Sequence, residues 1–301
     1  IEVGEPVGFP ISEDDLLAVS QRLVYCGKQK DVAEVRSWLR QFDDDARIET
    51  AFLLLRRMAE KGYVPEGERV LAMQRVEEVL KAAVGKPIVW NVVRGRHENL
   101  CVSYVDSETK SGASAAREVA KLLRPGKCAG AAEIGAWLQS HVDKEATLVI
   151  VDDFAGSGGT IVKGLSRFAQ NKADGAAFRK FCDTQSVHIV LLFSFPEAIK
   201  AIRDAFPEIK VTAIRVFGDE VRALESDAGI FENEGERRFA EDVLRQLGQQ
   251  LSPQHPVGHG HLGGLVLFHN TIPNNTLPVF WCGGTVNERV WHPLFHRASW
   301  A

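Results

Sequence analysis

The sequence lacks the cysteine pattern of a disulfide framework or a zinc site. It contains five cysteines, an odd number, and no two of them are spaced as C-x-x-C. It also lacks an N-terminal signal peptide and any apolar run near the 18 residues that a transmembrane helix needs. These absences predict a cytoplasmic protein in a reducing compartment, without a membrane partner.

Basic residues are not in excess. The chain has 36 lysines and arginines against 40 aspartates and glutamates, which gives a formal net charge of −4 at pH 7. A protein whose main task is to grip a nucleic-acid backbone usually carries a strongly basic surface, so the charge does not indicate a nucleic-acid partner. The 301 residues, 45% of them hydrophobic, are enough for an α/β domain with a smaller appendage and a sizeable core.

Residues 1–87 predict an all-helical N-terminal region. Ser12 and Asp31 each stand where a helix N-cap is expected, and Glu34 completes a capping box with Asp31. Apolar residues recur at helical spacing in four stretches: 16–23, 32–42, 48–58 and 70–80. The region carries no reactive cluster, so we expect its apolar residues to form core and a protein partner, if there is one, to dock on these helices.

Residues 88–301 predict an α/β domain. Short apolar runs rich in β-branched residues alternate with helical patterns, which is typical of a parallel sheet with helices on both faces. The predicted strands are 88–93, 100–105, 147–151, 187–193, 211–217 and 265–268. The predicted helices are 113–123, 131–141, one from 160, 196–206 and 232–251, and a linker-like loop follows at 252–264.

The segment 147–160 carries the functional prediction. A buried strand delivers Asp152 and Asp153 at its carboxyl end, where open α/β sheets bind ligands. A glycine-rich loop and a helix N-terminus follow at once, and free backbone N–H groups there favour a phosphate. The predicted phosphate loop consists of Ala155, Gly156, Ser157, Gly158, Gly159 and Thr160. The carboxylates suit hydroxyl donors or a hydrated magnesium ion, so a ribose 5-phosphate satisfies both halves.

Two other glycine-loop motifs are excluded by their spacing. A Walker loop needs a lysine before the final Ser or Thr, and a dinucleotide fingerprint needs its acid about 20 residues after the glycines. Here no lysine stands at that place, and both acids precede the glycines. The alternative is a strand-to-helix turn that binds nothing.

The run Val-Ile-Val-Asp152-Asp153, followed by Gly-Ser-Gly-Gly-Thr160, resembles the ribose-phosphate-binding signature of type I phosphoribosyltransferases. The resemblance implies a phosphoribosyltransferase-type core over roughly 88–218. It implies that Asp152 and Asp153 are the catalytic pair and hold the ribose hydroxyls of 5-phosphoribosyl-1-pyrophosphate (PRPP). It further implies that 155–160 wrap the 5-phosphate and that Mg²⁺ binds mainly through the substrate pyrophosphate, without a metal site made of protein ligands alone.

The sequence departs from the biosynthetic enzymes of that family. Those commonly have two threonines where this chain has Gly156 and Ser157. The phrase Asp-Asp-Phe-x-Gly-Ser-Gly is more similar to phosphoribosyltransferase-like domains of bacterial conflict and anti-phage systems, and so is the tail phrase 269–281. This resemblance implies an effector or a sensor.

A second loop is expected to meet the pyrophosphate. Strand 100–105 is followed by a polar loop that ends in Lys110, Ser111 and Gly112 at a helix N-terminus, which suits an anion. An ordinary exposed turn is the alternative. Arg94 and Arg96 lie in a nearby turn, where solvated charge is the favoured interpretation.

Three asparagines follow the last short strand. Asn270, Asn274 and Asn275 are candidates for a wall that reads a base or ribose, because an amide both donates and accepts hydrogen bonds. A hydrogen-bonded turn is the alternative. Phe217 could stack on a base or belong to the core. The histidines at 255, 259 and 261 have no acidic neighbour, so a solvated loop is favoured over a metal site.

These features predict a PRPP- or nucleotide-binding protein of the phosphoribosyltransferase class. The resemblance implies Mg²⁺-assisted displacement at the ribose anomeric carbon, used in anti-phage defence. Two alternatives stay open. One is a catalytically inactive nucleotide-binding module that regulates a partner protein, and the other is an effector that cleaves the glycosidic bond of a nucleotide.

Overall fold

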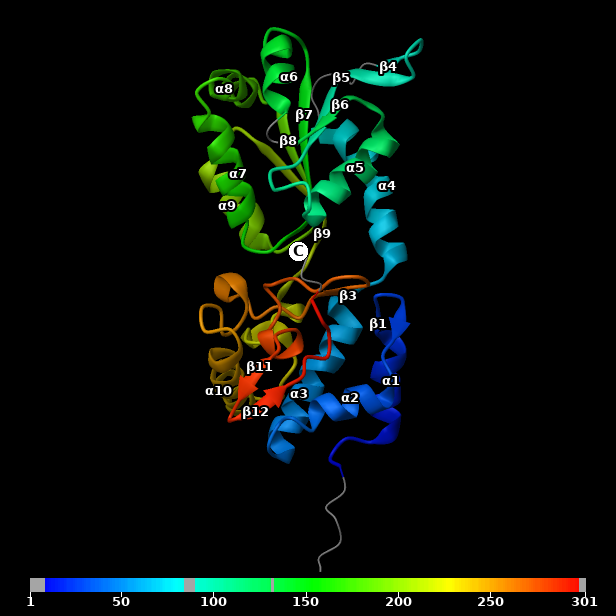
Figure 1. Ribbon diagram of the computed structural model, residues 1–301, viewed down its shortest axis with the longest axis vertical. Helices are drawn as coiled ribbons and strands as arrows, with labels where there is room; N and C mark the ends of the chain where they lie inside the picture. The colour runs from blue at the N-terminus through cyan, green and yellow to red at the C-terminus, as the bar shows by residue number, and fades with distance from the viewer. Residues whose placement is uncertain (1–8, 84–89, 131–132, 298–301) are drawn as a thin grey trace, which may run out of the picture. The chain divides into compact units, whose positions relative to one another are not determined.

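The computed structural model describes residues 9–83, 90–130 and 133–297, and the chain divides into two compact units (Figure 1). Unit 1 joins residues 1–66 to residues 218–301, whereas unit 2 is the continuous segment 67–217. These boundaries differ from the expected division at residue 87. The fourth predicted helix belongs with the sheet, and the C-terminal segment belongs with the first three helices.

Unit 1 begins with the helices that the caps predict. The Ser12 side chain accepts from the Asp15 N–H, and Asp31 and Glu34 form the expected capping box. The elements of the N-terminal segment are α1 (Glu13–Arg22), β1 (Val24–Tyr25), β2 (Lys28–Gln29), α2 (Val32–Leu39), α3 (Asp45–Arg57), a π-helical turn (Met58–Gly62) and β3 (Tyr63–Val64).

The C-terminal segment completes the core of unit 1. Trp38 of α2 stacks on Phe280 with 5.0 Å between ring centroids, and its indole N–H donates to the Val279 carbonyl at 3.1 Å. The indole of Trp291 donates to the same carbonyl. The elements of this segment are α10 (Glu234–Leu251), β10 (Leu267–Phe268), β11 (Gly284–Val286) and β12 (Arg289–Trp291), and β10 pairs in parallel with β3. Because these aromatic contacts join residues far apart in sequence, the segment cannot pack without the helices.

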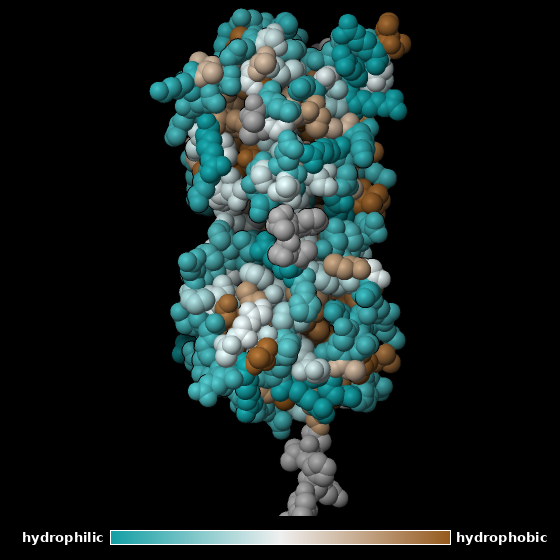
Figure 2. Space-filling model, viewed as in Figure 1, coloured by the Kyte–Doolittle hydropathy of each residue, from teal (hydrophilic) through white to brown (hydrophobic). Residues whose placement is uncertain are grey.

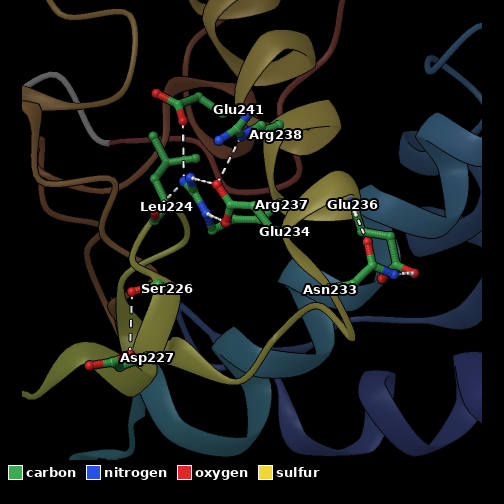
Figure 3. Close-up of polar contacts among 9 residues, drawn as sticks. All are labelled: Leu224, Ser226, Asp227, Asn233, Glu234, Glu236, Arg237, Arg238 and Glu241. Carbon is green, nitrogen blue, oxygen red and sulfur yellow. Dashed lines mark hydrogen bonds and ion pairs between the residues drawn. The ribbon is translucent and has the colours of Figure 1, made fainter.

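Helix α10 is held at its start by a polar network. The side chain of Asn233 caps the helix by accepting from the Glu236 N–H, as Figure 3 shows. Arg237 pairs with Glu234 and Glu241 and donates to the Leu224 carbonyl at 2.9 Å (Figure 3). The network ties the loop before α10 to its first two turns.

Unit 2 is built on a sheet of six strands. They are β4 (Trp90–Asn91), β5 (Arg96–Ser103), β6 (Pro125–Ala129), β7 (Thr147–Ala155), β8 (Val187–Ser194) and β9 (Lys210–Val216). Five of them run parallel in the order β6-β5-β7-β8-β9, and β4 pairs antiparallel with the start of β5. The predicted parallel sheet is confirmed.

Helices cover both faces of this sheet (Figure 1). On one face α6 (Ile134–His141), α7 (Gly159–Gln170), α8 (Gly175–Asp183) and α9 (Pro196–Ala205) enclose the larger apolar core. On the other face lies α5 (Ser111–Leu123), which is joined by ion pairing to α4 (Glu66–Ala83). The predicted α/β class is therefore observed in unit 2.

Two local predictions were incomplete. Strand 88–93 is reduced to Trp90–Asn91, because Val92 and Val93 form a hairpin turn and are 84% and 95% exposed; residues 88–89 lie outside the described residues. The helix predicted at 131–141 begins at Ile134, and 131–132 also lie outside the described residues.

In the described part of the chain, no helix is long and apolar enough to cross a membrane. On the face drawn in Figure 2, hydrophobic residues are scattered in small groups.

Candidate functional site

The strand order of unit 2 defines where a ligand can bind. From β5 the chain crosses to β6 on one side, and it then returns to place β7 on the other side of β5. The crossovers therefore change direction between β5 and β7. In open α/β sheets such a switch point opens a crevice beyond the carboxyl ends of the two strands. The loops that follow β5 and β7 are the two that the sequence selects.

The acid pair lies in the last part of β7 and is partly exposed. The backbone N–H of Asp153 donates to Asp152 Oδ1 at 3.0 Å. Helix α5 packs directly on the pair, because a Cβ added to Gly112 would lie 2.6 Å from Asp152 Oδ1. Glycine at position 112 thus allows the first turn of α5 to approach the acids.

The two carboxyl groups differ in electrostatic environment. Burial, followed by the charge of Asp153, raises the pKa of Asp152 well above its ordinary value. Burial also raises the pKa of Asp153, but hydrogen bonds from Ser111 and Asp152 and the charge of Arg69 oppose that rise. Of the two side chains, Asp153 is therefore the one that ionises more readily, and Asp152 is the one that retains a proton more readily.

The predicted phosphate loop forms the entry to α7. Gly158 is the N-cap, with φ at +76°, and its side-chain position is closed by the backbone of Ala198 at the start of α9. Helix α7 has no side-chain cap, so its first N–H groups point toward the loop without a partner from the helix itself. This is the arrangement in which helix N-termini bind phosphate.

The second loop also reaches the acid pair, through the first turn of α5. Lys110 is the exposed N-cap of α5, and Ser111, its first residue, hydrogen-bonds to Asp153. The loop itself is acidic as well as basic. Asp106 accepts from the Ser107 N–H at 2.8 Å, and its charge acts on Asp152.

The PRTase-CE family model matches residues 35–297. The chain belongs to the PRTase-CE family. The match includes residues of both compact units, and the α/β unit of this PRTase-CE protein is a type I phosphoribosyltransferase-like domain, as the β7 motif predicts. No curated protein matches the sequence.

Two solved structures illustrate what this PRTase-CE protein is similar to. One is the AQ2163 protein from Aquifex aeolicus, with 15% identity, 61% of this chain and 82% of that chain covered, and a TM-score of 0.32. The other is APRTase from Giardia lamblia complexed with 9-deazaadenine, with 12% identity, 49% of this chain and 78% of that chain covered, and a TM-score of 0.31.

Other candidate residues of the PRTase-CE protein have different environments. Phe217 is 0% exposed and lies among Phe154, Phe193 and Phe195, with ring centroids 5.9 to 6.3 Å away. It therefore occupies the core position that the sequence left open, and its stacking on a base stays a prediction. Arg94 and Arg96 pair with Glu98 on the β4–β5 hairpin, as solvated charges.

The three asparagines belong to unit 1, whereas the acid pair belongs to unit 2. Asn275 is 5% exposed, and its amide donates to the His259 carbonyl at 2.7 Å. The Asn274 carbonyl accepts from the His259 N–H at 2.8 Å, and Asn270 is exposed. Asn275 thus makes a hydrogen bond within a turn, which was the alternative, and its contact with a base or ribose stays a prediction.

Sequence reasoning missed two charged residues that act on the acid pair. Asp106 directly follows the predicted strand 100–105, and this position beyond a strand end could have indicated that it lies near the site. Arg69 lies on α4, which the sequence assigned to the N-terminal helical region, and only the tertiary fold places its charge near Asp153.

Proposed function

We propose that unit 2 binds the ribose 5-phosphate portion of PRPP or of a nucleotide. The observation that carries the proposal is the acid pair on β7 beside the uncapped N-terminus of α7. Carboxylates accept hydrogen bonds from vicinal hydroxyls, and the helix N-terminus favours the phosphate. The two features are separated by only five residues of one chain segment, 154–158, which suits a compact ligand that carries both groups.

For catalysis we propose displacement at the anomeric carbon of the ribose, with Asp152 and Asp153 holding the hydroxyls. Mg²⁺ would bind chiefly to the phosphate oxygens of the ligand, since oxygen atoms are its preferred ligands. Bound there, Mg²⁺ would stabilise the negative charge of the leaving pyrophosphate. Asp153, which ionises more readily than Asp152, would stabilise positive charge that develops on the ribose ring.

A second candidate is a nucleotide-binding module without turnover. The loop after β5 favours it, because Asp106 and Glu108 bring negative charge to the place where a pyrophosphate would leave. Part of its anion-binding capacity is also used internally: the Ser107 N–H donates to Asp106, and the Lys110 N–H donates to the Ser107 carbonyl at 3.1 Å. Such a module would report on a nucleotide to a partner protein.

The test measures binding and turnover separately. Calorimetry with PRPP and Mg²⁺ is expected to show binding, and Asp153→Asn is expected to weaken it by about tenfold or more. A tenfold loss of affinity corresponds to about 1.4 kcal/mol of binding free energy. Asp152→Asn is expected to weaken it less, because the raised pKa of Asp152 indicates a carboxyl that is more readily neutral. Asp183→Asn, an exposed aspartate at the end of α8, is the matched control.

Pyrophosphate release distinguishes the two candidates. Release that requires Asp153 supports the enzyme, whereas binding without release supports the module. If the wild-type protein binds neither PRPP nor a nucleoside monophosphate, ribose-phosphate recognition is ruled out. The proposed role in defence requires that expression protects bacteria from phage and that Asp153→Asn abolishes the protection. Protection that is unchanged in the variant contradicts it.

A further inference from the structure

Helix α4 makes a bidentate ion pair with α5. Arg69 donates to both carboxylate oxygens of Glu118, at 3.0 and 3.2 Å. The side chain of Arg69 is only 15% exposed and that of Glu118 34%. Most exposed ion pairs contribute little to stability. A bidentate arginine–carboxylate contact that is partly buried, in contrast, fixes the relative orientation of the two side chains as well as pairing their charges.

Glu118 connects this contact to the first turn of α5. The Ser114 hydroxyl donates to Glu118 Oε1 at 3.2 Å, so one carboxylate holds both Arg69 and a residue one turn earlier in α5. That same first turn contains Ser111, which hydrogen-bonds to Asp153, and Gly112, which packs on Asp152. Displacement of this turn would therefore move both contacts to the acid pair together.

The start of α4 is itself anchored from a second direction. Glu68, next to Arg69, pairs with Arg215 at the end of β9. The guanidinium of Arg215 lies over the ring of Phe217 at 4.5 Å, which limits its own freedom. Arg69 thus extends from a turn that is fixed to the sheet, and it can act as a rigid support for α5.

We propose that Arg69 is a positioning residue that holds the first turn of α5 against Asp152 and Asp153 through Glu118. The inference rests on the proposed binding of ribose phosphates at this pair. Arg69 acts on the ligand through α5, so Glu118 is as important to binding as Arg69. A site whose supporting turn is free to shift by about 1 Å loses affinity or rate steeply.

The test is a double-mutant cycle with Arg69→Gln, Glu118→Gln and the double variant. Binding of PRPP with Mg²⁺, and of ribose 5-phosphate alone, is measured by calorimetry. Each single variant is expected to lose about tenfold in affinity, and the double variant is expected to lose no more than either. Lys180→Gln, which breaks the ion pair to Asp143 elsewhere in unit 2, is the matched control and is expected to bind as the wild type does.

Hydrogen exchange gives a readout that needs no ligand. Amides of residues 113–116, the first in α5 with backbone acceptors, are expected to exchange faster in both single variants than in the wild type, while those of 187–194 in β8 stay protected. Equal losses in both variants together with local exchange support the proposal. A loss in Arg69→Gln alone overturns it, because Arg69 would then act only through the charge that it exerts on Asp153 and not through Glu118.

Unchanged exchange at 113–116 also overturns the proposal, whatever the ligand does. If the wild-type protein binds neither probe, the proposed function fails, and the exchange experiment still decides whether Arg69 holds the turn. Global unfolding in a variant would appear as faster exchange in β8 and a lower melting temperature, which is the outcome of a merely structural role and contradicts the inference.

Discussion

At the scale of single residues, the neighbours Gly158 and Gly159 differ in whether the structure requires a glycine: position 158 does, and position 159 does not. Gly158 has a φ of +76°, and a Cβ there would lie 2.9 Å from the Ala198 carbonyl oxygen. Gly159 has ordinary helical geometry, and the nearest atom to an added Cβ is Ser157 Oγ at 3.7 Å. We expect Gly158→Ala to destabilise unit 2 by about 1–3 kcal/mol, and Gly159→Ala to be neutral or stabilising by up to about 1 kcal/mol. Urea denaturation of both variants is the measurement; equal stabilities would contradict the role of Gly158.

We expect His188 to make the stability of unit 2 sensitive to acid. It is 2% exposed on β8, and burial, with the charge of Lys210, lowers its pKa to about 4. Because the folded pKa lies below that of the unfolded chain, about 6.5, its contribution is complete above pH 6.5 and is lost as the pH falls toward 4. The loss reaches on the order of 3 kcal/mol at pH 4.

His188→Leu is therefore expected to flatten the decline in unfolding free energy between pH 6.5 and pH 4. Urea titrations of the variant and the wild-type protein at pH 7, 5.5 and 4.5 measure the difference. Parallel decline in the two proteins would show that other groups control the acid sensitivity.

At the scale of elements, the β7–α7 segment could be predicted because its information is local. A buried apolar strand, two acids, glycines and a helix start follow one another within 147–160, and each has a direct structural counterpart. The capping residues Ser12 and Asp31 were predictable for the same reason, since a cap acts within three residues.

Strand β6 and helix α8 escaped prediction because their patterns are weak. Strand β6, Pro-Gly-Lys-Cys-Ala, has no apolar run. Among the residues that the structure describes it pairs with β5 alone, and most of the strand is not buried, so its position does not require apolar side chains. Helix α8 is only nine residues long and starts without a side-chain cap, at Asp174. The apolar pair Val92 and Val93 had the opposite effect: it predicted a strand where the chain forms a hairpin turn, in which both side chains are exposed.

Long-range placement was beyond the sequence. The burial of Phe217 among three other phenylalanines depends on how β7, β8 and β9 lie side by side. The proximity of Arg69 to the acid pair depends on which face of the sheet α4 joins. Residue types and spacing contain neither fact. For that reason the sequence left two roles open for Phe217 and did not indicate Arg69.

At the scale of the whole molecule, the division into units predicts which fragments fold. Unit 2 is one continuous segment with its own core, so a fragment of residues 67–217 is expected to unfold cooperatively in a thermal melt followed by circular dichroism. A fragment of 88–301 is expected to be partly unfolded, because it lacks Trp38 and Phe42, which pack against Phe280 and Trp291. Cooperative folding of 88–301 with native stability would contradict this division.

The discontinuity of unit 1 has a consequence for biosynthesis. A chain leaves the ribosome from its N-terminus, and domains fold as their residues emerge. Unit 2 can therefore fold during translation, while helices α1 to α3 wait for Val279 and Phe280, which are synthesised after unit 2. The nascent protein would hold a folded unit 2 before its first helices have a core, and we expect these helices to be the part most dependent on chaperones.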